Sequence, residues 1–412
     1  NVGCIPAKAL LHAAEMLHGV GTFERFGLAA DNPRYDGPAL MRRVRGVADK
    51  LRKGVGQLLQ GRKVDVIRGH GRLAGPGRLE VETADGTQSV QAKSIILATG
   101  SRPAWPGFLP AGCDRLFTTD QACVAEDLPA SALILGGGVI GVEFATIYAS
   151  LGIPTTVVEM LDRLLPLQDE DAGKAARRRL KKCKADIRTG TKVANVTVGD
   201  DGVIATLDSG DELSAAAMLV SVGRRANVED IGLDTVGLEV RDGIVPVDER
   251  CRTAAEGVYA VGDLAEKRQY AHLALRMGVV AADNATGHDA DDDRRFVPEV
   301  VYGTPDIASI RPPELPDGTT EATFPYQASG LGQAYGQTDG AVKIVADADG
   351  RVVAATVIGA HASEVIHELA LAARHGLTVE QVAKAIHAHP TFAEGVAEAA
   401  ESFLGLPLHT LH

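Results

Sequence analysis

SALILGGGVIGVEFATIYASLG, residues 131–152, is the stretch that decides the fold. The apolar run before its glycines predicts a buried strand, and the largely apolar residues after them predict a helix. The segment TTVVE, residues 155–159, predicts a second strand. A strand, a helix and a strand in this order form a βαβ unit with a parallel sheet. The sequence therefore predicts a doubly wound α/β domain around this unit.

Gly136, Gly138 and Gly141 follow the pattern GxGxxG between the predicted strand and helix. In this context the first glycine allows a tight turn, the second lets the backbone approach a pyrophosphate, and the third lets the helix pack closely on the strand. A glycine-rich turn without a ligand is the alternative. Glu159 ends the next strand, where an acidic side chain usually hydrogen-bonds ribose hydroxyls and repels a 2′-phosphate. The pattern therefore favours NAD over NADP.

Outside this unit the patterns predict a mixture of helices and short strands. Upstream they predict two helices, a strand meander with a turn at Asp85-Gly86, and a Pro-rich linker, at about residues 6–19, 38–60, 64–97 and 102–110. Downstream they predict a charged helix, two strands, a helix, a solvated acidic loop and two more helices. The charged helix is at 169–184, the strands are at 218–225 and 257–261, and the next helix runs to about 287. The acidic loop is at 289–295 and the last two helices are at 363–376 and 378–387. Thr378 and Gln381 have capping-box spacing at the start of the last helix.

Composition narrows the function classes. The 412 residues suggest two to four domains, and their formal net charge of −12 argues against nucleic acid or anionic membrane as a partner, since both are bound through clustered Lys and Arg. No stretch reaches the roughly 18 uninterrupted apolar residues of a membrane helix. The cysteines are odd in number and scattered, which favours a reducing cytoplasm, and without CxxC spacing they predict no metal site. They are Cys4, Cys113, Cys123, Cys183 and Cys251.

Two polar groups have both a structural and a functional interpretation. Asp263 follows the strand predicted at residues 257–261, where it either caps the next helix or binds a nucleotide. In HAHPTFAE, residues 387–394, Pro390 biases His389 away from helix, and Thr391 and Glu394 have capping-box spacing. Glu394 is therefore either a capping partner or the carboxylate that orients His389 as a general base.

Seven stretches together resemble the flavin-dependent disulfide reductases, most closely those that oxidise dihydrolipoyl groups with NAD. They follow the family's order over nearly the whole chain, which is far more specific than any one of them. The stretches are NVGCIPAKALL (1–11), ILATGSRP (96–103), ILGGGVIGVEFA (134–145), VVEMLDRLLP (157–166), VSVGRRAN (220–227), GVYAVGDLA (257–265) and AHPTFAEGVAEAA (388–400).

The resemblance implies a homodimer whose subunits each bind FAD and NAD, with a redox-active disulfide of C-x4-C spacing. Cys4 matches the second, flavin-side cysteine, and Lys8 is expected near the flavin. The first cysteine and the family's first strand with its own GxGxxG are expected upstream of Asn1, so the FAD domain is expected to be incomplete at its N-terminus. Further cofactor contacts are implied for Thr99, Gly100, Glu143, Gly223, Gly262, Asp263 and Ala271.

The resemblance also implies that His389 is the acid/base acting on the disulfide of the other subunit, with Glu394 as its orienter. A cis bond before Pro390 is a further expectation. The implied substrate is a dihydrolipoyl group, free or carried on a 2-oxoacid dehydrogenase complex. Ala7, Ala226 and Arg311 depart from the family's usual Ser, Pro and Gly, which leaves open another disulfide, thiol or metal acceptor. A non-catalytic, dimerising nucleotide-binding fragment is the third alternative.

The expected fold class is α/β, with two doubly wound nucleotide-binding domains followed by an α+β dimerisation domain. We expect a first part of the FAD-binding domain at residues 1–115 and an NAD-binding domain at 116–240. A second, central part of the FAD-binding domain is expected at 241–296, and the dimerisation domain at 297–412.

Overall fold

The stretch around the three glycines forms the centre of a five-stranded parallel sheet. In the computed structural model, which describes residues 2–411, β7 runs over Ala132–Leu135, α4 over Val139–Ser150 and β8 over Thr155–Val158. The strand order is β6-β13-β7-β8-β9, and every pair is parallel. The other strands are β6 (Leu116–Phe117), β13 (Ala217–Val220) and β9 (Asp186–Arg188). The predicted βαβ unit is confirmed.

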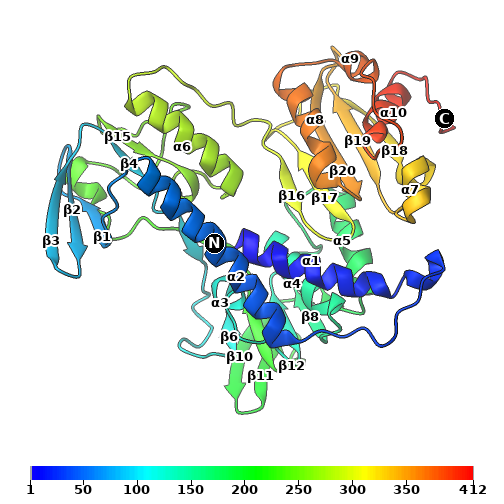
Figure 1. Ribbon diagram of the computed structural model, residues 1–412, viewed down its shortest axis with the longest axis horizontal. Helices are drawn as coiled ribbons and strands as arrows, with labels where there is room; N and C mark the ends of the chain where they lie inside the picture. Colours follow the sequence, from blue (N-terminus) through cyan, green and yellow to red (C-terminus); the bar gives the residue numbers. More distant parts are fainter. Residues whose placement is uncertain (1, 412) are drawn as a thin grey trace. The chain divides into compact units, whose positions relative to one another are not determined.

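Two helices from distant parts of the sequence cover this sheet together with α4. Helix α1, Cys4–Val20, packs along α4 (Figure 1), and α5, Glu170–Lys182, follows β8. The Asp169 carboxylate caps α5 by accepting a hydrogen bond from the Asp171 N–H. Almost every residue of α4 is buried, because α1 and α5 cover it on the sides that the sheet leaves open. Short helix α3, Thr119–Ala122, and the antiparallel strands β10 (Val193–Gly199), β11 (Gly202–Leu207) and β12 (Glu212–Ala215) complete this region.

Residues 299–403 form a five-stranded antiparallel sheet with helices packed on it. The strand order is β16-β17-β20-β19-β18, and all eight residues of β20 are buried. Helix α8 packs on β20 and β17, and α10 packs on β18 and β19 (Figure 1). The strands are β16 (Glu299–Val301), β17 (Asp306–Ile310), β18 (Thr320–Pro325), β19 (Ala341–Ala346) and β20 (Val352–Gly359); the helices are α7 (Gly330–Tyr335), α8 (Ala362–Arg374), α9 (Val379–Ala383) and α10 (Glu394–Phe403). The capping box predicted at Thr378 and Gln381 is confirmed at the start of α9.

These regions belong to one compact unit, made of the residues up to Arg52, Trp105–Val222 and the residues from Arg295 onward, and Lys53–Ala104 with Gly223–Arg294 forms a second. The second unit contains an antiparallel meander of β1 (His70–Leu73), β2 (Arg78–Thr83) and β3 (Gly86–Gln91), with the predicted turn between β2 and β3. Its β4 (Ile95–Leu97) pairs in parallel with β15 (Val258–Ala260), and α6 (Ala271–Ala285) packs against both.

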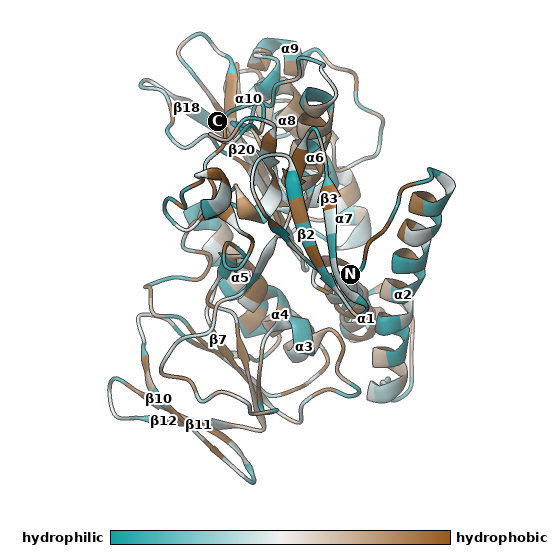
Figure 2. Ribbon diagram, turned by 90° about the vertical axis from the view of Figure 1, so that its left-hand side faces the viewer, coloured by the Kyte–Doolittle hydropathy of each residue, from teal (hydrophilic) through white to brown (hydrophobic). Residues whose placement is uncertain are grey.

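Helix α2 spans Gly37–Gly61; its residues up to Arg52 belong to the first unit and those from Lys53 to the second. Many residues of this helix are hydrophilic (Figure 2). The described part of the chain also contains the short 3₁₀ helices η1 (Phe23–Phe26), η2 (Leu233–Val236), η3 (Gly262–Leu264) and η4 (Tyr326–Ala328). Among residues 2–411 no helix is both long and apolar enough to cross a bilayer.

Two predictions about local structure are wrong. The run MLVSVGRR does not form one strand, because β13 ends at Val220 and Gly223, with φ +108°, turns the chain into β14, Arg224–Ala226. Strand β14 pairs antiparallel with β5, Ser101–Pro103. The apolar residues before Gly223 suggested that one strand continues, but a glycine inside a strand pattern can also mark a break of this kind.

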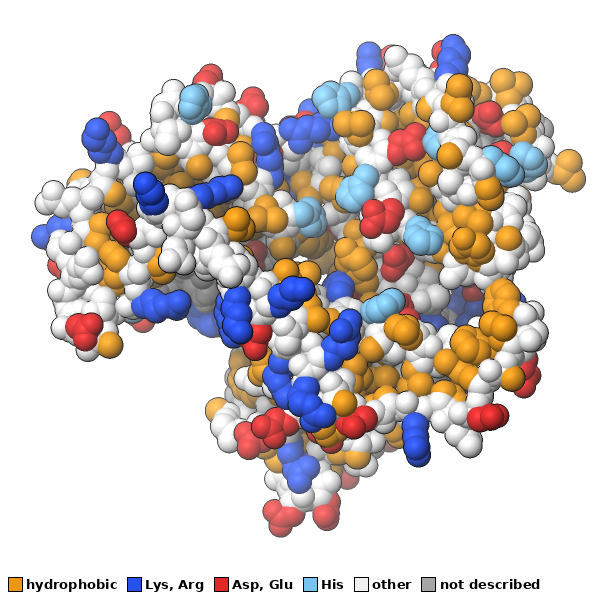
Figure 3. All heavy atoms as spheres, in the orientation of Figure 1, with side chains coloured by type: hydrophobic (Ala, Val, Ile, Leu, Met, Phe, Trp, Pro, Cys, Tyr) orange, Lys and Arg blue, Asp and Glu red, His pale blue; other side chains and the backbone are white. Residues whose placement is uncertain are grey.

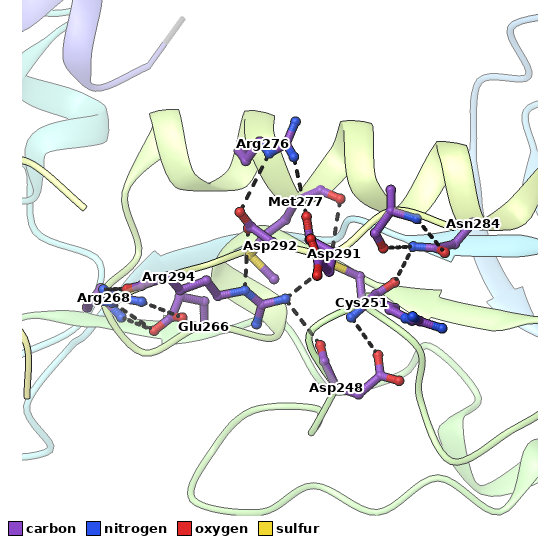
Figure 4. Close-up of polar contacts among 12 residues, drawn as sticks. Asp248, Cys251, Glu266, Arg268, Arg276, Met277, Asn284, Asp291, Asp292 and Arg294 are labelled. Carbon is purple, nitrogen blue, oxygen red and sulfur yellow. Dashed lines mark hydrogen bonds and ion pairs between the residues drawn. The ribbon is translucent and has the colours of Figure 1, made fainter. Parts of the chain in front are cut away.

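The acidic run at residues 289–295 is not simply a solvated loop. The Asp292 side chain is only 2% exposed and faces Arg276 of α6 and Arg294, at 3.5 Å from each Nε (Figure 4). Arg294 also donates from Nη2 to the carbonyl oxygen of Asp248 and lies 3.2 Å from Cys251 Sγ. The positive charges of the two arginines explain why the Asp292 carboxylate can be buried although it lies in a polar stretch of sequence.

Candidate functional site

The three glycines predicted to bind a dinucleotide each meet a different environment. A Cβ on Gly136, whose φ is +107°, would lie 2.5 Å from the Ser221 carbonyl oxygen, and a Cβ on Gly141 would lie 1.9 Å from the Gly136 carbonyl oxygen. A Cβ on Gly138 would meet no described heavy atom within 4 Å. The first and third glycines are therefore required by packing, while the second leaves open space at the N-terminus of α4, where backbone N–H groups attract an anion.

Glu159 closes this turn from the end of β8. Its side chain is buried, and its carboxylate accepts hydrogen bonds from the Gly137 N–H at 2.6 Å and the Leu161 N–H at 2.8 Å. The carboxylate thus sits at the strand end predicted for ribose recognition, although the structure gives its two oxygens backbone partners. Because the open space beside Gly138 and the acidic strand end coincide, the turn fits the diphosphate and ribose of NAD.

Lys8 of α1 and Glu143 of α4 form an ion pair. The resemblance had implied a place near the flavin for Lys8 and a cofactor contact for Glu143, without pairing them. Lys8 Nζ lies 2.7 and 2.9 Å from the two carboxylate oxygens of Glu143, and Oε1 also accepts a hydrogen bond from the Tyr302 N–H at 3.1 Å. Glu143 is 4% exposed, and its burial raises the pKa of the carboxyl, an effect that Lys8 partly offsets. Lys8 Nζ also lies 4.5 Å from the centre of the Tyr302 ring.

Cys4 is the first residue of α1 and is exposed. Lys8 lies four residues further along the same helix, so the two side chains share one face. By contrast, Cys123 is buried, and burial raises the pKa of its thiol to about 12, which makes it unreactive at neutral pH. All five cysteines are free in the structure. The exposed thiol at a helix N-terminus is therefore the better nucleophile of the two.

His389 and Glu394 are brought together, and Glu394 contacts both His389 and the backbone of Thr391. Glu394 Oε1 lies 2.8 Å from His389 Nδ1, while Oε2 accepts a hydrogen bond from the Thr391 N–H at 2.7 Å. The Thr391 hydroxyl donates to the carbonyl oxygen of Ala388 instead of capping, and α10 begins at Glu394 itself, so the reciprocal capping box is absent. The expected cis bond before Pro390 is present.

This arrangement settles the tautomer of a neutral His389 ring. Because the carboxylate can only accept, Nδ1 carries the proton and Nε2 carries the free lone pair. The His389 side chain is 78% exposed, so Nε2 is accessible to a proton donor. The pKa of Glu394 lies below its ordinary value: burial acts to raise it, but the Thr391 N–H and His389 outweigh burial. The carboxylate therefore stays ionised beside the imidazole.

The residues assigned to flavin contacts in the second unit cluster where β5, β14 and η3 meet. Asp263 Oδ2 accepts a hydrogen bond from Ser101 Oγ at 2.5 Å, and Arg224 Nε lies 3.9 Å from the same oxygen. Thr99 Oγ1 donates to the carbonyl oxygen of Asn227 at 2.8 Å, and Asn227 Nδ2 donates to the carbonyl oxygen of Thr99.

The glycines of this cluster have left-handed backbone. Gly100, Gly223 and Gly262 have φ of +69°, +108° and +64°, and a Cβ on Gly100 or Gly223 would meet no described heavy atom within 4 Å. Helix α6 begins at Ala271, and the residue at its N-cap position, Tyr270, provides no side-chain cap. A carboxylate, two open glycine turns and an uncapped helix start fit the polar chain and ring edge of a flavin nucleotide.

Sequence reasoning missed several residues of these sites. Ser101 and Arg224 lie inside quoted family stretches but were given no role, and they hold Asp263 in place. Tyr302 donates its N–H to Glu143, and His387 pairs with Glu368 on α8. The family stretches could have pointed to Ser101 and Arg224. The other two pairs join residues that are 159 and 19 positions apart in the sequence, so no local pattern indicates them.

Comparison with known proteins shows to which family the whole chain is related. Residues 1–278 match the pyridine nucleotide-disulphide oxidoreductase family, and residues 297–400 match the dimerisation domain of the same family. The chain is 38% identical to the dihydrolipoyl dehydrogenase of Halobacterium salinarum, over all of this chain and 90% of that protein. It is 36% identical to a dihydrolipoyl dehydrogenase of Bacillus subtilis, over 99% of this chain and 89% of that protein.

Solved structures show the same fold. LpdA of Mycobacterium tuberculosis superposes with a TM-score of 0.90 at 26% identity, over 97% of this chain and 90% of that one. The flavoprotein disulfide reductase RclA of Escherichia coli superposes with a TM-score of 0.87 at 24% identity, over 98% and 90% of the two chains. The α/β fold class predicted from the sequence is confirmed, and the family implies FAD and NAD as cofactors. The chain belongs to the pyridine nucleotide-disulphide oxidoreductase family.

Proposed function

We propose that this protein is a dihydrolipoyl dehydrogenase that oxidises a dihydrolipoyl group to the cyclic disulfide and reduces NAD⁺ to NADH, with release of one proton. The observation that carries the proposal is the likeness to dihydrolipoyl dehydrogenases from several organisms, at 34–38% identity over 97–100% of this chain. The site geometry supports it, because a thiol-oxidising enzyme needs a base, an exposed thiol and a dinucleotide turn.

The base is His389. Its Nε2 lone pair accepts a proton from a substrate thiol, since the thiolate rather than the thiol attacks a disulfide. Glu394 holds the ring through Nδ1 and stabilises the imidazolium that forms, as the carboxylate partner of a histidine base does. The exposed Nε2 is free to reach a substrate, and the resemblance implies that this substrate is bound at the disulfide of the other subunit.

Cys4 is the proposed flavin-side thiol of the redox pair, and Lys8 is proposed to place a positive charge beside the flavin. Glu143 keeps the Lys8 ammonium at one position through two short contacts. Bound FAD supplies two-electron transfer between a dithiol and the nicotinamide. Asp263 is the proposed partner of the flavin's polar chain, and its carboxylate is held in place by Ser101.

The proposed assembly is a homodimer in the cytoplasm, with the dihydrolipoyl group supplied free or by a 2-oxoacid dehydrogenase complex. The matched dimerisation domain supports the dimer. We also propose the domain division 1–115 and 241–296 for FAD, 116–240 for NAD and 297–412 for dimerisation. The parallel sheet lies at 116–220 and the antiparallel sheet at 299–359, which is compatible with that division.

The test is steady-state oxidation of dihydrolipoamide by the purified protein, with NAD⁺ and NADP⁺ in parallel. We expect NADH formation with a clear preference for NAD⁺, and a loss of roughly 100-fold or more in kcat for His389→Gln. His375→Gln is the matched control, because His375 is an exposed histidine at the end of α8 in the same domain. Turnover of another disulfide but not of dihydrolipoamide would refute the proposed substrate.

A further inference from the structure

The histidine two residues before His389 has a different environment from its neighbour. His387 Nε2 lies 3.0 and 3.2 Å from the two carboxylate oxygens of Glu368 on α8, and Nδ1 lies 3.0 Å from the carbonyl oxygen of Ala385. The His387 side chain is only 9% exposed, compared with 78% for His389. Histidine side chains are visible at several places on the face drawn in Figure 3. The little-exposed His387 side chain lies against Glu368 of α8.

Both partners of the His387 ring are acceptors. A carbonyl oxygen and a carboxylate have no proton to give, and a neutral imidazole has only one N–H. A neutral His387 would therefore leave one lone pair facing an oxygen, whatever tautomer it adopted. Only the imidazolium supplies a donor at each nitrogen.

We propose that His387 is held as an imidazolium by Glu368 and acts as a positioning residue for His389. The segment between α9, which ends at Ala383, and α10, which begins at Glu394, has His389 near its middle. His387 ties that segment to α8 through Glu368 and closes it on itself through the Ala385 carbonyl. Because the His389 ring is exposed, its position depends on this segment and on Glu394.

The pair also sets the charge balance around His389. Glu394 of α10 contacts His389 directly, and the neighbouring elements carry Glu368 on α8 and the Glu380–Lys384 ion pair at α9. His387 and Glu368 together are neutral, so the net local field on His389 comes mainly from Glu394. Removing the His387 charge alone leaves Glu368 uncompensated, which favours the protonated form of His389. A positive charge on His387 also lowers the pKa of Glu394, but this effect is smaller than those of burial, the Thr391 N–H and His389.

The experiment follows the His389 ring by NMR of protein labelled at histidine side chains, in the whole protein between pH 5 and 9. In His387→Gln the titration midpoint of His389 is expected to rise by roughly 0.5 pH unit, the effect of one uncompensated charge near a partly solvated group. In His387→Gln/Glu368→Gln the midpoint is expected to return towards that of the unaltered protein. In Glu368→Gln, His387 is expected to lose its second proton at a lower pH.

His367→Gln is the matched control, since His367 is an exposed histidine on α8 beside Glu368 in sequence. An unchanged His389 midpoint in His387→Gln, or an equal shift in the single and double variants, would overturn the inference. The same holds if His387 has only one proton at neutral pH. The inference rests on the proposed role of His389 as a base, but the NMR midpoints need no turnover. A protein inactive with dihydrolipoamide that shows these shifts would refute the proposed function and leave this inference standing.

Discussion

The Lys8–Glu143 pair gives a prediction that links stability to pH. Glu143 is 4% exposed and the Lys8 side chain 29% exposed, so replacing Lys8 by Met leaves a buried carboxylate without its cation. Removing one partner of a buried ion pair costs about 3–5 kcal/mol, and the partial exposure of Lys8 places this case near about 3 kcal/mol. We expect Lys8→Met to destabilise the protein by this amount at neutral pH.

The sign of the pH dependence follows from Glu143. Burial raises the pKa of this carboxyl in the folded state, so folding favours its protonated form and stability declines as pH rises above about 4.3, the ordinary value for Glu. In Lys8→Met the lowering effect of Lys8 is gone, and the pKa of Glu143 rises further. The decline then extends to higher pH, at up to about 1.4 kcal/mol per pH unit. The variant should therefore be much closer to the unaltered protein at pH 5 than at pH 8.

The assay is unfolding of the cofactor-free protein by heat and by urea at pH 5, 6.5 and 8. Lys8→Met/Glu143→Gln should recover most of the loss and remove its pH dependence, because no charge is left buried. Lys174→Met is the control, since its pair with Glu170 is on the surface and worth little. Equal destabilisation by Lys8→Met at pH 5 and pH 8 would show that the loss is one of packing and would refute the electrostatic reasoning.

Three further predictions concern the glycine turn and two carboxylates. Gly138→Ala should keep the melting temperature but weaken NADH binding in a fluorescence titration, whereas Gly141→Ala should lower the melting temperature, because its Cβ would lie 1.9 Å from a backbone oxygen. Glu394→Gln should lower kcat roughly tenfold or more and move the acidic limb of the pH–rate profile to lower pH, because the carboxylate no longer stabilises the imidazolium. A hydrogen bond and attraction from Glu398 raise the pKa of His409, so this contact stabilises the C-terminal tail below about pH 6.5 and is lost as pH rises through the folded-state pKa. Hydrogen exchange in the tail should increase over that range, and His409→Gln should remove the pH dependence.

Local signals explain which parts of the fold could be predicted from the sequence. The glycine turn, the Asp85-Gly86 turn and the capping box at Thr378 depend on residues within a few positions of one another, so their patterns are complete in the sequence. The single strand expected over residues 218–225 was wrong because Gly223 interrupts a run whose first five residues, largely apolar, favour strand. One residue with positive φ outweighed the pattern of the five before it.

The candidate sites were predictable only in part, because their pairs join distant residues. His389 and Glu394 are five residues apart and could be paired from the sequence, although the division of the two Glu394 oxygens between His389 and Thr391 could not. Asp292 lies in an acidic run, and its burial depends on Arg276, a helical residue 16 positions earlier. Charge patterning describes solvated surfaces well, but it cannot identify a single carboxylate that is buried beside two arginines.

The buried carboxylate of Glu159 has a consequence for altering the choice of nucleotide. Its two oxygens accept hydrogen bonds from the Gly137 and Leu161 N–H groups, so the side chain proposed to reject a 2′-phosphate also holds the backbone of the loop proposed to bind the diphosphate. A substitution meant to admit NADP, such as Glu159→Ala, would leave two backbone donors without their acceptor at a buried position. Nucleotide selectivity and the stability of the loop thus depend on the same side chain. A change of nucleotide in this chain requires a new acceptor for the two backbone N–H groups as well as a cation for the 2′-phosphate.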